Sequence, residues 1–206
     1  RDGTEIPQVT DDGIWEDLTT GAWCYHNNDP TRGKLYNWFA VAGIHDNDPN
    51  SPIKEFAPDG WHVPSDTEWT TLVNYLIANG YNYDGTTTQN QIAKSVASTS
   101  GWDSYPVVSA VGNNQSLNNT SGFNGTPSGN RYIYGNFQNY GKKAFFYSSS
   151  EGDNSSISRI HHMTNESSSF ESGNSYKKNG FSVRFVRDTV DTEPPVITIN
   201  GATTVS

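Results

Sequence analysis

The chain has 206 residues, enough for one domain with a substantial core or for one domain and part of another. Only 33% of the residues are hydrophobic but 13% are aromatic, so we expect an aromatic core and many loops. With 13 Lys and Arg against 22 Asp and Glu, the net charge is −9, which argues against nucleic acid and anionic membranes as partners. No run of apolar residues is long enough for membrane insertion.

Residues 1–32 alternate Trp and Tyr with turn-forming residues and are typical of loops. This segment holds the single cysteine, Cys24, which excludes an internal disulfide and a multi-cysteine zinc site. A lone cysteine is more often an inert buried residue than a reactive thiol. Residues 1–20 lack a signal-peptide pattern, and because the chain opens on Arg1 we expect it to be a piece of a longer protein.

The sequence predicts two helices. Residues 33–42 have apolar positions at helical intervals of three and four, which indicates a short helix ending at Gly43. Residues 66–79 predict a second helix that stops at Gly80. Its start carries a capping box, in which Ser65 caps the helix and Glu68 reaches back to the Ser65 amide. Its apolar face consists of Trp69, Leu72, Val73 and Leu76.

The second half of the chain predicts loops followed by strands. Residues 81–130 are rich in Asn, Ser, Thr and Gly, with a weak helix near residues 89–97 and interspersed aromatic residues that indicate ordered loops. Runs rich in aromatic and β-branched residues predict strands at 131–137, 143–149, 156–163 and 182–186. Helices followed by strands favour an α+β fold with a small antiparallel sheet and long irregular loops.

A domain boundary is expected at residue 188. Residues 188–191 are typical of a linker, and a proline pair at 194–195 precedes an alternating strand at 196–199. We therefore expect one domain over residues 1–188, and over residues 189–206 a linker and the first strand of a truncated immunoglobulin-like domain.

Four motifs occur in order and at suitable spacing: GKLYNWFAV at 33–41, APDGWHVPS at 57–65, SGFN at 121–124 and GFSVR at 180–184. Together they resemble the Fibrobacter succinogenes major paralogous domain (FISUMP), a family of bacterial surface and secreted modules. The resemblance covers roughly residues 1–188. Residues 191–198 look like the opening of a bacterial immunoglobulin-like repeat of large adhesins. Both resemblances imply an extracellular protein, secreted or on the bacterial cell surface.

The motifs at 63–69 and 180–184 are more distantly similar to the formylglycine-generating enzyme family, whose fold is a variant of the C-type lectin fold. This similarity implies two helices around a twisted, mostly antiparallel sheet. Many relatives have a cysteine at the position of Phe185, able to pair with one at the position of Cys24, and that pairing is lost here. The chain also lacks the cysteine pair with which these enzymes hold copper, so we expect no catalysis.

Two groups of residues are candidate metal ligands. Asp46, Asp48 and Asn50 have the alternate spacing with which a turning loop aims oxygen atoms at calcium, although no acidic residue occupies the twelfth position of the loop. A solvated acidic turn is the alternative. His161 and His162 are adjacent, and in a strand they point to opposite faces, which argues against a shared ion.

Aromatic residues in the loop-rich half are candidates for sugar binding, because aromatic rings pack against the C–H faces of sugars. Tyr132 and Tyr134 share one face if residues 131–137 form a strand. The alternative is that the aromatic residues form the core of a small sheet. The candidate ligand-binding residues are Trp102, Tyr132, Tyr134, Tyr140, Phe146 and Tyr147, together with the turn residues Asp153 and Asn154.

We therefore expect a non-catalytic, extracellular recognition or adhesion module. It would contact a glycan, or a protein on another surface, through residues 100–170, and it would adjoin immunoglobulin-like domains of the same chain. The alternatives are a structural or assembly module and an oxidase related to the formylglycine-generating enzymes, which would need a reactive Cys24.

Overall fold

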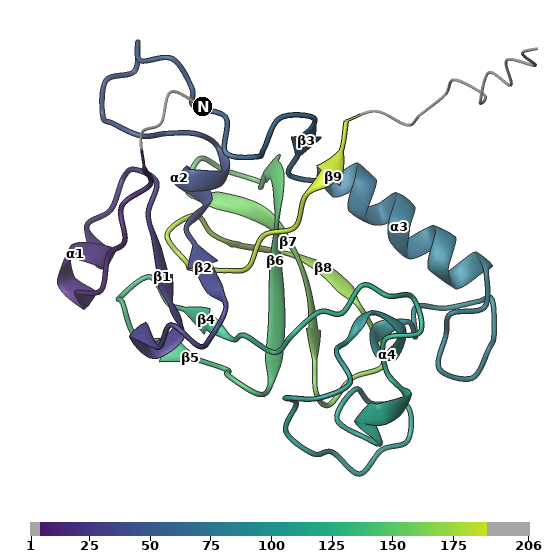
Figure 1. Cartoon of the computed structure of the whole chain (residues 1–206). Coiled ribbons are helices and arrows are strands. Elements are labelled where there is room, and N and C mark those ends of the chain that lie inside the picture. Colours follow the sequence, from purple (N-terminus) through teal and green to yellow (C-terminus); the bar gives the residue numbers. More distant parts are fainter. Residues whose placement is uncertain (1–4, 189–206) are drawn as a thin grey trace, which may run out of the picture.

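The computed structural model of the chain describes residues 5–188, so the linker and strand expected at residues 189–206 lie outside the described residues. The described strands pair antiparallel in four small sheets, with the orders β1-β2, β3-β9, β4-β5 and β6-β7-β8 (Figure 1). Few helices and small antiparallel sheets make this an α+β fold, as the sequence predicts. Within residues 5–188, no helix is both long and apolar enough to cross a membrane.

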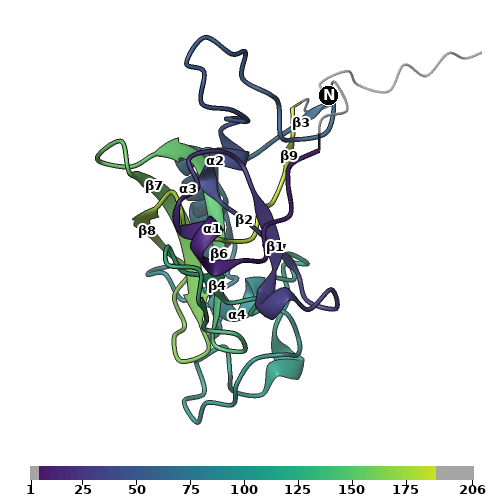
Figure 2. The same cartoon turned by 90° about the vertical axis from the view of Figure 1, so that its left-hand side faces the viewer.

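The strands are β1 (Trp23–Tyr25), β2 (Lys34–Tyr36), β3 (Trp61–His62), β4 (Asn130–Arg131), β5 (Phe137–Gln138), β6 (Lys143–Glu151), β7 (Ile157–Thr164), β8 (Glu171–Tyr176) and β9 (Val186–Arg187). The α-helices are α1 (Asp12–Glu16), α2 (Trp38–Val41), α3 (Asp66–Ala78) and α4 (Ala93–Val96), and short 3-10 turns lie at His26–Asn28 and Gln115–Leu117. The loop of residues 44–53 projects from the top of the molecule in both views (Figures 1 and 2).

The helix predicted at residues 66–79 is confirmed as α3, including its capping box. The Ser65 hydroxyl accepts from the Glu68 amide at 3.3 Å, and a Glu68 carboxylate oxygen accepts from the Ser65 amide at 2.8 Å. The helix ends before Gly80, whose φ of 75° suits the left-handed turn that glycine adopts at low cost.

The helix predicted at residues 33–42 is wrong over its first half. Lys34–Tyr36 form β2, which pairs with β1 and places Leu35 opposite Cys24 in the core. Only Trp38–Val41 are helical, and the Asn37 side chain caps this single turn by accepting from the Ala40 amide. Pairing with β1 decides the conformation here, so the described residues hold one long helix instead of two.

The strands predicted at 143–149 and 156–163 are confirmed as β6 and β7, and β7 is the central strand of the three-stranded sheet. The third strand, β8, was not predicted, because its sequence ESGNSY is polar and its side chains are mostly exposed on an edge strand. Residues 131–137 are not one strand. Arg131 ends β4, Phe137 begins β5, and residues 132–136 form the turn between them, where Gly135 has a φ of 89° and an added Cβ would lie 2.4 Å from the Asp12 Cβ.

Residues 180–182 connect three of the sheets. Gly180 bridges Arg131 of β4, Phe181 bridges Tyr36 of β2, and Ser182 bridges Phe146 of β6. The chain then leaves β6 and pairs with β3, so the strand predicted at 182–186 is confirmed only at its last residue. The motif at 57–65 is therefore paired with the residues that directly follow the motif at 180–184.

The buried residues form three apolar clusters. The largest packs α3 and α4 against β6 and β7 around Trp69, Phe146 and Phe170. The second contains Trp38, Tyr147 and Phe181, and the third contains Trp15, Cys24 and Leu35. Figure 2 shows α1 and the β1–β2 pair in front of the central sheet.

Candidate functional site

Three of the predicted ligand-binding aromatic residues are buried in the core. Trp102, Phe146 and Tyr147 are exposed over 5%, 2% and 0% of their surface. The Tyr147 hydroxyl donates to the backbone oxygen of Asn179 at 2.6 Å, so its polar atom is also satisfied internally. The prediction that these three residues contact a ligand is therefore wrong in this structure, because packing against the core takes their surface.

Tyr132 and Tyr134 lie on the turn between β4 and β5, not on one face of a strand. Their rings contact edge to face with centroids 5.5 Å apart, and Tyr134 is 58% exposed. The pair still presents an aromatic surface, although the shared strand face predicted for it is wrong.

Asp153 and Asn154 lie on the turn between β6 and β7. Asp153 accepts from the Asn174 side chain at 2.5 Å, and Asn154 accepts from the Ser156 amide at 3.0 Å. Tyr140 precedes β6 and Asp153 follows it. A nine-residue strand spans roughly 30 Å, so these residues do not form one site with Tyr140.

Tyr140 borders a groove of about 260 Å³. We call this the Tyr140 groove, and its lining residues are Thr31, Arg32, Gly33, Ser100, Gly101, Thr126, Pro127, Ser128 and Tyr140. The groove lies between the connection from β1 to β2 and the loop segments at 100–101 and 126–128, with Tyr140 at its border. Hydroxyl groups line much of it, and Tyr140 is 48% exposed.

Arg32 orients Tyr140 in this groove. The guanidinium carbon lies 3.9 Å from the centroid of the Tyr140 ring, while Nε contacts Asp29 at 3.2 Å and Nη1 contacts His26 Nδ1 at 3.0 Å. Burial lowers the pKa of His26, so its neutral ring can accept this hydrogen bond. Arg32 Nη2 has no hydrogen-bond partner within residues 5–188, so its N–H groups are available to a ligand.

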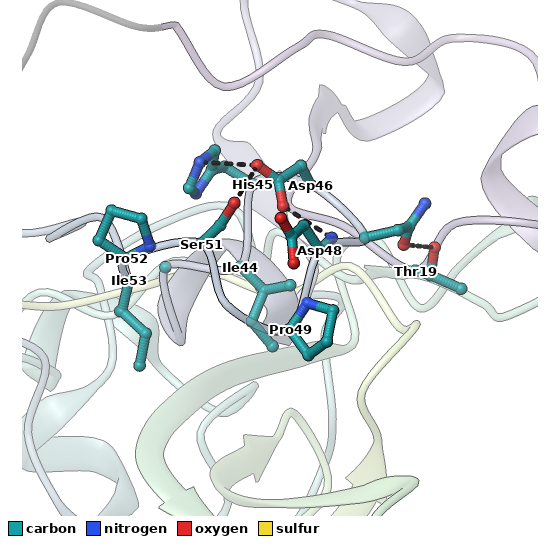
Figure 3. Close-up of a pocket in the computed structure, with 11 residues that line it drawn as sticks. Thr19, Ile44, His45, Asp46, Asp48, Pro49, Ser51, Pro52 and Ile53 are labelled. Atoms are coloured by element: carbon teal, nitrogen blue, oxygen red, sulfur yellow. Dashed lines mark hydrogen bonds and ion pairs between the residues drawn. The ribbon is translucent and has the colours of Figure 1, made fainter.

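The acidic loop at residues 44–53 surrounds a cavity of about 380 Å³ (Figure 3). Asp46 accepts from the Asp48 amide at 2.9 Å and from the Ser51 hydroxyl at 2.8 Å, and the Ser51 bond in particular lowers the pKa of Asp46. Asp48 accepts from the Asn50 amide at 2.9 Å. Among the described residues, no group of three or more His, Cys, Asp and Glu side chains is placed to hold a metal ion. The calcium site at Asp46, Asp48 and Asn50 stays a prediction.

His161 and His162 point to opposite faces of β7, as predicted. His161 is buried, stacks on Trp69 with centroids 5.2 Å apart, and approaches Asp66 Oδ1 at 3.0 Å. His162 stacks on Phe145 on the other face. Burial lowers the pKa of both imidazoles.

Cys24 is fully buried beside Trp15 and Leu35. Burial raises the pKa of its thiol to about 11, with Arg131 acting weakly in the opposite direction. The prediction of an inert buried thiol fits this environment, because a reactive cysteine needs access and a lowered pKa.

One long helix, small antiparallel sheets and extended polar loops define an α+β domain with a candidate groove at Tyr140 and an acidic loop apart from it. The chain belongs to the family of the Fibrobacter succinogenes major domain, whose family model matches residues 1–187. No curated protein and no solved structure matches the chain.

Proposed function

We propose that this domain is a non-catalytic recognition module of a bacterial surface or secreted protein, and that it binds a glycan in the Tyr140 groove. Its arrangement of helix, small sheets and loops would be a variant of the C-type lectin fold. Immunoglobulin-like domains of the same chain would be its neighbours.

The observation that carries this proposal is the exposed Tyr140 ring beside a groove of hydroxyl groups. A sugar offers C–H faces to an aromatic ring and hydroxyl groups to hydrogen-bonding side chains. Thr126 and Ser128 supply hydroxyls 2.9 Å apart, and Arg32 supplies unused N–H donors. A neutral, polyhydroxylated ligand also suits a chain with a net charge of −9, which disfavours polyanions.

The test is a glycan array followed by calorimetric titration of each ligand found, with calcium present. Tyr140→Ala should weaken binding at least about tenfold, which corresponds to about 1.4 kcal/mol. Tyr75→Ala is the matched control, because Tyr75 is 60% exposed on α3 and does not line the groove. Tyr134→Ala tests whether the glycan binds instead to the aromatic pair of Tyr132 and Tyr134.

Unchanged affinity in Tyr140→Ala, with a loss in Tyr134→Ala, would move the site to the β4–β5 turn. Absence of binding to any glycan by the wild-type protein would remove the glycan proposal itself.

A second candidate function is a structural or assembly module. The burial of Trp102, Phe146 and Tyr147 supports it, because the aromatic residues then serve mainly to stabilise the fold. Such a module should bind no glycan, and its melting temperature should rise when it is produced together with the domain that follows it. A recognition module should bind its ligand equally well with or without that neighbour.

A further inference from the structure

A further cavity lies between α3, the loop around Phe123 and the segment that contains β9. It has a volume of about 340 Å³, within the range of roughly 300–1,000 Å³ typical of small-molecule sites. Figure 1 shows β9 beside the first turns of α3. The residues that line this cavity, which we call the Arg184 pocket, are Pro64, Glu68, Trp69, Leu72, Phe123, Arg184, Phe185 and Val186.

The walls of the Arg184 pocket are mostly apolar. Trp69 forms its buried base, and Phe185 and Val186 stay 37% and 38% exposed although both are apolar. Exposed apolar side chains around a concave site indicate a surface that a ligand covers.

Arg184 is a half-buried cation that pairs with no carboxylate of residues 5–188. Its Nη2 donates to the Asn124 backbone oxygen at 3.0 Å, and no other hydrogen bond of its guanidinium occurs within the described part of the chain. A guanidinium has five N–H donors, so four of them have no protein acceptor there. Burial lowers the pKa of Arg184, as expected of a partly desolvated cation.

The other buried or half-buried arginines of residues 5–188 each have an aspartate partner. These pairs are Arg32 with Asp29, Arg131 with Asp12 and Arg159 with Asp66. The one acidic residue of the pocket, Glu68, forms no ion pair with Arg184, and its two oxygens accept hydrogen bonds from His62 and Ser65 instead.

The Arg184 guanidinium is held in place by aromatic rings. Its central carbon lies 4.9 Å from the Phe123 centroid and 5.7 Å from the Phe146 centroid. Such contacts fix the planar fork, so little conformational freedom is lost when it pairs with a carboxylate. A preoriented fork at the edge of an apolar cavity favours a ligand with a carboxylate on an apolar body.

From this charge and shape we infer that the Arg184 pocket binds a small organic monocarboxylate, with the carboxylate on Arg184 and an aromatic or aliphatic body against Trp69, Leu72 and Phe123. This site is distinct from the Tyr140 groove and does not depend on glycan binding.

The test titrates the whole domain with 3-phenylpropionate and with its neutral amide, which has the same shape. Hexanoate, phenylacetate and indole-3-acetate extend the series, and binding is measured by calorimetry and by ligand-observed NMR. We expect saturable binding of at least one carboxylate and at least tenfold weaker binding of the matching amide. Equal binding of acid and amide, or no binding by any member of the series, would overturn the inference.

Two arginine variants localise the carboxylate. Arg184→Gln should reduce the affinity for the carboxylate to that for the amide. Arg187→Gln is the matched control: it removes the same charge three residues further on, where Arg187 is exposed and stacks on Trp61 outside the pocket. An equal loss in both variants would mean that only the net charge matters, and would contradict a site at Arg184.

A third variant keeps the experiment decisive if Arg184→Gln fails to fold. Leu72→Trp fills the pocket from α3 while leaving Arg184 in place, and it should abolish binding of the carboxylate. Retained binding in a folded Leu72→Trp protein would place the carboxylate elsewhere and overturn the inference.

Discussion

Nδ1 of His62 lies 2.6 Å from Oδ1 of Asp188. The other ring nitrogen, Nε2, lies 2.7 Å from Glu68 Oε1, and the second oxygen of Glu68 accepts from Ser65 at the start of α3. One imidazole thus joins the beginning of the long helix to the last described residue of the domain.

The His62 contacts predict a pH-dependent stability. The hydrogen bond to Asp188, and then that to Glu68, raises the pKa of His62 in the folded state above its usual value of about 6.5. The protonated ring therefore stabilises the fold below about pH 6.5, and this stabilisation is lost as the pH rises through the higher folded-state pKa. The melting temperature of His62→Gln should fall further below that of the wild type at pH 5.5 than at pH 8.5.

Asp188→Asn is the control for this prediction, because it removes the largest cause of the shift and keeps the ring. Its melting temperature should also lie further below that of the wild type at pH 5.5 than at pH 8.5. A difference between wild type and His62→Gln that is the same at both pH values would show that the ring acts by packing alone.

Truncation of the Arg131 side chain should greatly reduce the stability of the fold. Its side chain is fully buried, contacts Asp12 at 2.7 Å and donates to the backbone oxygens of Val9, Thr10 and Gly135. Arg131→Ala leaves these acceptors without a donor and opens space beside the ring of Trp15. The free energy of unfolding should therefore fall by on the order of 3 kcal/mol.

Chemical denaturation measures this change. The comparison variant is Arg159→Ala, which breaks a partly exposed pair with Asp66 and should cost about 1 kcal/mol or less. Similar losses for the two variants would contradict the structural role assigned to Arg131.

Cys24 should not react with a thiol reagent in the folded protein. With a pKa of about 11, roughly one thiol in a thousand is ionised at pH 8, and burial blocks access to it. Labelling should therefore occur at the rate of global unfolding and become fast in denaturant. Rapid labelling of the native protein would restore the alternative of an oxidase that uses this cysteine.

Calcium binding by Asp46, Asp48 and Asn50, as predicted from the sequence, requires the ion to raise the melting temperature, because an ion bound only by the folded state stabilises it. Chelator should lower the melting temperature, and Asp48→Asn should remove this response. Ser167→Ala serves as a variant outside the loop that should leave the response intact. A melting temperature indifferent to chelator would eliminate the site and leave a hydrogen-bonded acidic turn.

Local signals predicted the parts of the fold that depend on neighbours in sequence. The capping box at Ser65 and the apolar face ending at Leu76 specify α3 within a dozen residues. By contrast, Lys34–Tyr36 follow a helical pattern but pair with β1, and the polar β8 gains its strand conformation from β7. Pairing across the sheet is not visible in the local sequence.

The same distinction applies to the candidate site. Tyr140 was among the predicted aromatic residues, but its partner Arg32 precedes it by 140 − 32 = 108 residues and carries no motif of its own. Arg131, directly before Tyr132, joins β4 to residues 9–12 through its guanidinium, and it also carries no motif of its own. Tertiary packing decides whether an aromatic side chain is exposed. The sequence alone therefore could not show that Phe146 and Tyr147 are buried while Tyr140 is exposed.

The bridges from residues 180–182 to β2, β4 and β6 also bear on how the chain folds. Each joins residues far apart in sequence, so these three bridges between sheets can form only when nearly the whole domain has been synthesised. Contacts of such long sequence separation slow folding, since the entropy of closing the loops is lost before the contacts form. The order of residues along the chain thus makes assembly of this domain a late event, completed by its final segment.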